Sequence, residues 1–321
     1  MSRLAFAIET GAITLPETGT IAVVGPPFGY DLSPLPKDRL IVVTTFKPDH
    51  DAFEAMGYAV DVAAPQKPAA TIIIAGRSKA LNLTCIAMAA THDAPIVVDG
   101  GKDAGIDSLY KSVRKITQVS PAVAKAHGKV FSLTPTLDLL EFAVEPAEFD
   151  GFKTFPGVFS ADGVDPGSAL LASVLPALKG TIGDLGAGWG YLSSEALQAS
   201  PEIDSIHLVE ADLSALSCAK QNLSDPRAQF HWADATSWQP ETPLDAIIMN
   251  PPFHTSRAAD PDLGRAFIDA AARALAPKGS LWLVANRQLP YEATLKERFK
   301  TGQELAGNNR FKIFHASVPR R

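Results

Sequence analysis

The sequence predicts an α/β protein made of two doubly wound, Rossmann-like domains in tandem. Both halves of the 321-residue chain alternate short β-branched runs with segments of helical length, which is the pattern of parallel α/β sheets. Between the halves, residues 145–157 have no clear hydrophobic period and contain two prolines and two glycines. We expect the domain boundary within residues 145–152, which gives domains 1–150 and 151–321.

In the first half, the buried-strand pattern recurs four times. Strands are predicted at residues 20–25, 39–46, 70–76 and 94–101, with helices at 79–90 and 105–116. In the second half, strands are predicted at 181–186, 205–212, 228–235, 244–250 and 280–286, with a β-like pair around 310–318. The helices between them are expected at 167–178, 191–200, 213–223 and 265–276. In such a sheet, ligands bind beyond the carboxyl ends of the strands.

The composition is that of a soluble globular protein, with 46% hydrophobic and 20% charged residues. Nothing approaches the ~20 consecutive apolar residues of a membrane helix, and the N-terminal stretch "MSRLAFAIETG" is neither a signal peptide nor an anchor. The two cysteines, Cys85 and Cys218, have no metal-ligand spacing and form no disulfide framework. We expect a cytoplasmic, monomeric protein without a metal or a membrane partner.

The net charge of −6 conceals a gradient along the second half. Residues 151–256 contain four Lys and Arg against twelve Asp and Glu, and residues 257–321 contain twelve against six. A basic surface beside an acidic centre can guide a polyanion. Solvated helix faces would give the same counts, so both interpretations stay open.

The first turn differs between the halves. The stretch "DLGAGWGYL" places Gly186, Gly188 and Gly190 at alternate positions between a strand and a helix, where glycine permits a tight turn and the close approach of a ligand. The corresponding stretch "VVGPPFGYDL", residues 23–32, has prolines instead. We therefore interpret the first half as a related scaffold without its ligand loop.

Polar residues stand at the ends of the next strands. Glu210 closes one strand and is placed to accept both hydroxyls of a ribose, and Asp234 closes the following one, where it can hold an adenine amino group. The fourth strand ends in "MNPPFH", in which Pro251 and Pro252 stop the strand and stiffen the turn after Asn250. Each is by itself an ordinary strand end, but their consecutive occurrence indicates a ligand site.

These motifs resemble those of class I S-adenosylmethionine-dependent methyltransferases: Asp184 to Gly190, Glu210, Asp234 and the Asn250-Pro-Pro-Phe253 turn. The segments "FPGVFSADGVDPGSALL", "NPPFH", "VANRQLPYE" and "NRFKIFHA" are similar to bacterial 16S ribosomal RNA guanine N2-methyltransferases over roughly residues 152–318. That family pairs a degenerate methyltransferase-like N-terminal domain with a working C-terminal one. Trp189 within the glycine turn is a departure that the motif tolerates.

The resemblance implies S-adenosylmethionine as the cofactor and ribosomal RNA or the assembled small subunit as the partner. It implies that Asp165, Asp184, Gly186, Gly188, Gly190, Glu210, Asp234, Ala235 and Asn250 hold the cofactor, with Asp165 at its methionine end. Asn250 and Pro251 would accept the N–H groups of a planar amine, Phe253 would stack on the base, and Arg287, Arg310 and Lys312 would reach RNA phosphates.

Other interpretations remain open at this point. His254 suits a structural role better than that of a general base, and Asp165 can equally mark a helix start, with Ser168 the better N-cap candidate. Arg287, Arg310 and Lys312 can equally be solvated. The same amine clamp would admit adenine N6 or a glutamine amide, so a protein-glutamine methyltransferase, an enzyme for a 23S guanine and a non-enzymatic ribosome-assembly factor are the alternatives.

Overall fold

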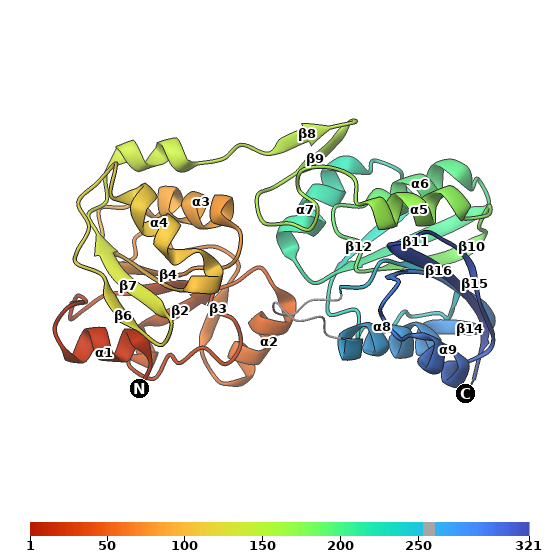
Figure 1. The fold of residues 1–321 in the computed structure, drawn as a ribbon, viewed down its shortest axis with the longest axis horizontal. Coiled ribbons are helices and arrows are strands. Elements are labelled where there is room, and N and C mark those ends of the chain that lie inside the picture. The colour runs from red at the N-terminus through yellow and green to blue at the C-terminus, as the bar shows by residue number, and fades with distance from the viewer. Residues whose placement is uncertain (253–260, 321) are drawn as a thin grey trace. The chain divides into compact units, whose positions relative to one another are not determined.

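The computed structural model describes residues 1–252 and 261–320. The chain divides into two compact units, Met1–Pro146 and Ala147–Arg321 (Figure 1). The division lies within the stretch 145–152, slightly before the predicted boundary at residue 150. Phe253 and His254 lie outside the described residues, so the structure has no bearing on their predicted roles.

The sheet of the N-terminal unit has the strand order β3-β2-β1-β4-β5-β7-β6. The first five strands in this order are parallel, whereas β7 is antiparallel to both of its neighbours. The strands are β1 (Ile21–Val24), β2 (Leu40–Val43), β3 (Ala59–Asp61), β4 (Ala70–Ile74), β5 (Ile96–Gly101), β6 (Val123–Lys125) and β7 (Gly128–Leu133).

The sheet of the C-terminal unit repeats this topology in the order β12-β11-β10-β13-β14-β16-β15. Again five strands are parallel, and β16 runs antiparallel between β14 and β15. The strands are β10 (Gly180–Leu185), β11 (Ile203–Glu210), β12 (Ala228–Trp232), β13 (Leu244–Met249), β14 (Leu275–Asn286), β15 (Phe299–Gly307) and β16 (Phe311–Pro319).

Helices cover both faces of each sheet, so each unit has two apolar layers. In the N-terminal unit, α1 (Arg3–Glu9) and α2 (Lys47–Ala55) pack on one face, and α3 (Lys79–Ala89) and α4 (Ile106–Val113) on the other. In the C-terminal unit, α5 (Pro166–Val174), α6 (Tyr191–Ala199) and α7 (Leu213–Asn222) lie opposite α8 (Pro261–Ala274) and α9 (Glu292–Arg298). The prediction of two α/β domains in tandem is confirmed.

A short hairpin opens the C-terminal unit, where the sequence suggested a plain connector. It consists of β8 (Ala147–Phe149) and β9 (Phe152–Thr154). Trp189, only 4% exposed, packs against Phe149 and Phe152 and donates from Nε1 to the Phe159 carbonyl at 3.0 Å. The bulky residue in the glycine turn therefore points away from the turn and anchors this hairpin.

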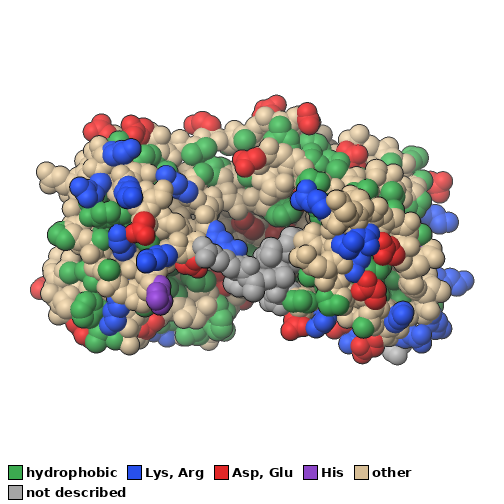
Figure 2. Space-filling view, viewed as in Figure 1, with side chains coloured by type: hydrophobic (Ala, Val, Ile, Leu, Met, Phe, Trp, Pro, Cys, Tyr) green, Lys and Arg blue, Asp and Glu red, His purple; other side chains and the backbone are tan. Residues whose placement is uncertain are grey.

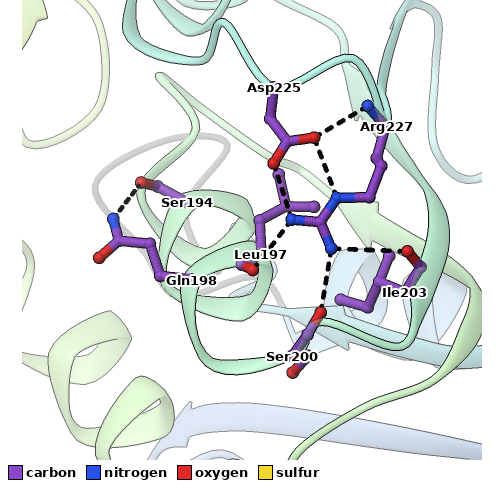
Figure 3. Close-up of polar contacts among 7 residues, drawn as sticks. All are labelled: Ser194, Leu197, Gln198, Ser200, Ile203, Asp225 and Arg227. Atoms are coloured by element: carbon purple, nitrogen blue, oxygen red, sulfur yellow. Dashed lines mark hydrogen bonds and ion pairs between the residues drawn. The ribbon is translucent and has the colours of Figure 1, made fainter.

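An ion pair between Arg227 and Asp225 caps the C-terminal end of α6 (Figure 3). Arg227, just before β12, donates through Nε and Nη2 to the two carboxylate oxygens of Asp225, at 3.0 and 2.7 Å. Its guanidinium also donates to the carbonyls of Leu197 and Ser200, both at 3.1 Å. A cation is favourable at this helix end, where carbonyls lack intrahelical partners. The contact ties α6 to the loop before β12.

The predicted strands and helices all occur within a few residues of their predicted bounds. Besides the β8–β9 hairpin, the sequence did not predict the helices α1, α2 and α9 or the strands β3, β6 and β7. Among the described helices, none is long and apolar enough to cross a membrane.

Candidate functional site

The predicted glycine turn lies at the carboxyl edge of the C-terminal sheet, between β10 and α6. Gly186, Gly188 and Gly190 have φ of +76°, +57° and +92°, a backbone region that side chains with a Cβ rarely adopt. A Cβ at Gly188 would meet no atom within 4 Å, so space is open at this turn. A Cβ at Gly186 would lie 3.9 Å from Cδ of Pro252, so the glycine turn and the Asn-Pro-Pro turn are neighbours.

Asp184 is the buried acid of this edge. Its side chain is 0% exposed, and its Oδ2 accepts a hydrogen bond from Oγ of Ser193 at 2.7 Å. Within the described part of the chain, Oδ1 has no hydrogen-bond partner. Burial raises the pKa of Asp184 to about 7, the Glu210 charge adds to this rise, and the bond from Ser193 opposes it. An unpaired buried carboxylate oxygen calls for a donor.

Glu210, at the end of β11, holds the glycine turn in place. Its Oε2 accepts from the Gly188 N–H and its Oε1 from the Asp212 N–H, both at 2.8 Å. Burial raises the pKa of Glu210, while these two backbone donors lower it. Because each carboxylate oxygen has two lone pairs, Glu210 can still accept two hydroxyls from a ligand.

Asp234 and Ala235 follow β12 at the same edge. Oδ1 of Asp234 accepts from both the N–H and the hydroxyl of Thr236, at 2.8 and 2.7 Å, so its Oδ2 remains as an acceptor. Ala235 is 4% exposed and its methyl group belongs to the core. Its predicted cofactor contact can therefore involve only backbone atoms.

Asn250 follows β13 and is held through its amide nitrogen. Nδ2 donates to Oδ2 of Asp165 at 3.0 Å and to Oγ of Ser168 at 2.8 Å. Asp165 is itself the N-cap of α5, because the same Oδ2 accepts from the Ser168 N–H at 2.8 Å. The expectation that Ser168 is the better N-cap was wrong; Ser168 lies one turn inside and is 8% exposed.

The three cations predicted to reach phosphates have different surroundings. Lys312 is 4% exposed and forms an ion pair with Glu292, so the prediction of a surface contact does not hold for it. Arg287 is exposed, but its guanidinium donates to the Asn308 carbonyl at 2.6 Å and to Glu304 at 2.9 Å. Arg310 is exposed, with its guanidinium 5.3 Å from the centre of the Phe311 ring.

The basic stretch at the end of the chain is partly neutralised. Four of its described cations form ion pairs: Arg265 with Asp262, Arg287 with Glu304, Arg298 with Asp269, and Lys312 with Glu292. Figure 2 accordingly shows Lys and Arg side chains among Asp and Glu on the visible face of the C-terminal unit. The charge gradient along the sequence therefore overstates the basic surface.

Sequence reasoning missed Ser168 and Ser193 as partners within the site. Ser193 lies on the first turn of α6, directly after the glycine turn, and this position is the signal that could have indicated its bond to Asp184. Ser168 is separated from Asn250 by 82 residues. No local pattern connects those two residues.

Two other features contain none of the residues predicted for this site. A hollow of about 790 Å³ lies at the amino ends of β10, β11 and β13 and contains none of the predicted site residues; among those lining it are Lys179, Asp204, Asp245 and Lys278. On α2, the side chains of His50, Asp51 and Glu54 come within metal-ligand distance of one another, but Asp51 is already paired with Lys47. Neither feature combines the donors and acceptors found at the carboxyl edge.

Residues 151–315 match the family model described as the methyltransferase small domain. The chain belongs to this methyltransferase family. It is 33% identical over 249 residues to ribosomal RNA small subunit methyltransferase C of Hahella chejuensis, which covers 74% of this chain and 72% of that relative. It is 30% identical over 253 residues to ribosomal RNA large subunit methyltransferase G of Shewanella oneidensis, covering 76% and 62% of the two chains.

A solved structure has the same fold over nearly the whole chain. A T. thermophilus 16S rRNA N2 methyltransferase, in complex with AdoMet and guanosine, aligns with a TM-score of 0.80 at 23% identity. The alignment covers 98% of this chain and 92% of that one. The predicted methyltransferase-like fold of both units of the present chain is thereby confirmed.

Proposed function

We propose that this protein transfers a methyl group from S-adenosylmethionine to the exocyclic N2 of a guanine in small-subunit (16S) ribosomal RNA. The relative from Hahella chejuensis, named as a small-subunit rRNA methyltransferase, supports the substrate. The observation that carries the proposal is the orientation of Asn250. With its Nδ2 engaged by Asp165 and Ser168, its Oδ1 remains as an acceptor at the carboxyl edge.

The residues of this edge fit S-adenosylmethionine. The orphaned Oδ1 of Asp184 suits a cationic or N–H donor, and Glu210 suits ribose hydroxyls. The open backbone at Gly188 suits close contact with the ligand, and Oδ2 of Asp234 suits an adenine amino group. When bound, the cofactor supplies an electrophilic methyl carbon on a sulfonium, and the chain supplies binding and orientation.

The substrate amine needs positioning rather than deprotonation. The lone pair of guanine N2 is delocalised into the ring, so the amine is a poor nucleophile. Oδ1 of Asn250 and the carbonyl of Pro251 each accept one N–H, which draws the nitrogen towards tetrahedral geometry. The N2 lone pair then forms the new bond to carbon, the electrons of the carbon–sulfur bond remain on sulfur, and one N–H proton is lost to solvent. Phe253 is proposed to stack on the base.

The stiffness of the Asn-Pro-Pro turn is part of this proposal. Two consecutive prolines fix φ, and Pro251 is buried against the core. Misplacement of a reacting group by about 1 Å can cost ~100-fold in rate. A base within a helix must in addition be unstacked, at a cost of a few kcal/mol.

RNA docking is assigned to both units. In the N-terminal unit, Arg77, Lys79 and Lys102 are exposed in the segments that follow β4 and β5. In the C-terminal unit, Arg310 lies in the turn between β15 and β16, beside the end of β14, where Asn286 pairs with Phe311. We further infer a monomer that acts in the cytoplasm, where ribosomal subunits are assembled.

Transfer of labelled methyl groups tests the proposal. We expect label in 16S rRNA or a 30S particle, and nucleoside mass spectrometry should identify N2-methylguanosine. Label in 23S rRNA instead would favour the role of the large-subunit relative. Label on a protein glutamine, with RNA unlabelled, would place the enzyme among the protein-glutamine methyltransferases. No transfer to any of these would support the non-enzymatic assembly factor.

A further inference from the structure

The amide of Asn250 has one orientation. Its Nδ2 lies 3.0 Å from Oδ2 of Asp165 and 2.8 Å from Oγ of Ser168. A carboxylate oxygen accepts hydrogen bonds and cannot donate them. A flipped amide would place Oδ1 against Asp165, where two acceptors repel each other. Asp165 therefore sets which end of the amide faces the carboxyl edge.

Asp165 itself is held in place by α5. Its Oδ2 accepts the Ser168 N–H at 2.8 Å, and the chain continues from Asp165 into α5 through Pro166. Pro166 fixes φ at the start of the helix, and a Cβ at Gly167 would come within 2.9 Å of Oδ2 of Asp165. The carboxylate thus has little freedom to leave Asn250, and Ser168, 8% exposed, has equally little.

We propose that Asp165 and Ser168 are positioning residues for methyl transfer, and that the charge of Asp165 polarises the Asn250 amide so that its Oδ1 becomes a stronger acceptor. This inference rests on the proposed function and extends it. It assigns Asp165 to the substrate amine, in place of the predicted contact with the methionine end of the cofactor.

The polarisation acts on turnover more than on binding. As the new nitrogen–carbon bond forms, positive charge grows on the substrate nitrogen and on its N–H groups. A hydrogen bond to Oδ1 therefore strengthens from the ground state to the transition state. An interaction of this kind raises kcat and leaves KM nearly unchanged.

A double-mutant cycle on the full-length chain separates this role from helix capping. The substitutions are Asp165→Asn and Ser168→Ala, each made in the native chain and in the Asn250→Ala variant. Asn is as good an N-cap as Asp, so Asp165→Asn keeps the cap and removes the charge. We expect it to lower kcat about tenfold or more, with KM for RNA, cofactor affinity and melting temperature nearly unchanged.

The result in the Asn250→Ala background decides the inference. If Asp165 and Ser168 act through Asn250, neither substitution should lower kcat further once Asn250 is absent. A loss of the same size in both backgrounds would overturn the inference, and so would a loss that appears only as weaker cofactor binding. Failure of the proposed function is distinguishable from this, because it appears in the native chain, which then methylates no rRNA before any substitution is made.

A spectroscopic readout needs no activity. In the unliganded protein, the side-chain NH2 signals of Asn250, assigned by their loss in Asn250→Ala, should exchange slowly with solvent and shift in Asp165→Asn. If the NH2 signals exchange fast, and equally so in the native protein and in Asp165→Asn, the hydrogen bond from Asn250 to Asp165 is contradicted.

Discussion

In both units, a glycine with positive φ follows the strand that comes first along the chain in the seven-stranded sheet. Gly25 follows β1 at +68° and Gly186 follows β10 at +76°. Each donates its N–H, at 2.9 Å, to the last valine of the neighbouring strand, Val43 in β2 and Val209 in β11. The backbone at the first glycine is therefore alike in both sheets. The turns diverge after it, because Pro27 stands where Gly188 has a positive φ, which proline cannot adopt.

The side chains around that turn are different. The strand registers align Val23 with Asp184 and Ile74 with Asn250. In the same way, Thr44 stands where the C-terminal unit has Glu210. The N-terminal sheet thus lacks the acid, the ribose acceptor and the amide of the C-terminal site. The comparison shows that the fold persists without these groups, and we propose that methyl transfer depends on them.

Among the described residues, each unit also has one buried aspartate, and the two differ in their partners. Asp99, 1% exposed, accepts from the hydroxyl of Tyr30 and forms an ion pair with Arg3. Asp184, 0% exposed, has Ser193 on one oxygen and no partner among the described residues on the other. Burying a polar group without a partner is costly. The satisfied Asp99 suits a structural role, and the unpaired oxygen of Asp184 supports the proposed cofactor site.

The largest expected contrast is between Asn250 and Ile74. Asn250→Ala removes a transition-state acceptor, which typically costs about 3–4 kcal/mol, or 10²–10³ in turnover, and should leave cofactor affinity within a few-fold. Ile74→Val, at the aligned position, should lower stability by about 1 kcal/mol and leave turnover unchanged. Single-turnover methyl transfer measures the turnover of both variants, and thermal unfolding measures the stability of Ile74→Val. Near-normal turnover in Asn250→Ala would contradict the role of Asn250 as an acceptor for the substrate amine.

The next contrast concerns the glycine turns. Gly188 and Gly29 both have positive φ, and a Cβ at either would meet no atom within 4 Å. Gly188→Val and Gly29→Val should therefore carry similar backbone strain. We expect only Gly188→Val to block S-adenosylmethionine binding, measured by calorimetry. Equal loss in both variants would mean that strain, and not the space for a ligand, limits binding.

A smaller effect should appear in the pH dependence of stability. Burial raises the pKa of Asp184 to about 7 in the folded protein, from 3.8 for a free carboxyl group. The folded state therefore keeps a proton that the unfolded state has lost, so the unliganded protein should lose stability as pH rises towards 7 and then level off. Between pH 6 and pH 8 the loss should be about 1.4 kcal/mol.

Asp184→Asn should abolish this part of the pH dependence. The C-terminal unit should then melt at more similar temperatures at pH 6 and pH 8, as followed by calorimetric scans without ligand. An unchanged pH dependence in this variant would show that another group titrates there.

The smallest effect concerns RNA. Arg310→Glu, at the carboxyl edge, should flatten the log–log salt dependence of RNA binding by about 0.7–0.9 per lost phosphate contact, without altering cofactor affinity. Lys278→Glu makes the same charge change at the amino edge, where Lys278 is exposed, and should leave the slope unchanged. Equal slopes for the two variants would contradict an RNA footprint at the carboxyl edge.

The sequence predicted the central strands because their apolar runs are continuous, and it predicted the strand-end residues because parallel strands end at one edge. It did not predict the short edge strand β3, whose pattern is weak, or the burial of Lys312. That burial depends on Glu292, which lies 20 residues away. The contact of Asn250 with Asp165 spans 85 residues, so it is a consequence of tertiary packing that no local pattern contains.

We propose that the C-terminal unit alone carries the cofactor site. Calorimetric titration of S-adenosylmethionine into the full chain and into the fragment Ala147–Arg321, a compact unit by its internal contacts, tests it directly. We predict one site per chain, with similar affinity in both proteins. Two sites in the full chain, or binding that requires residues 1–146, would contradict the claim.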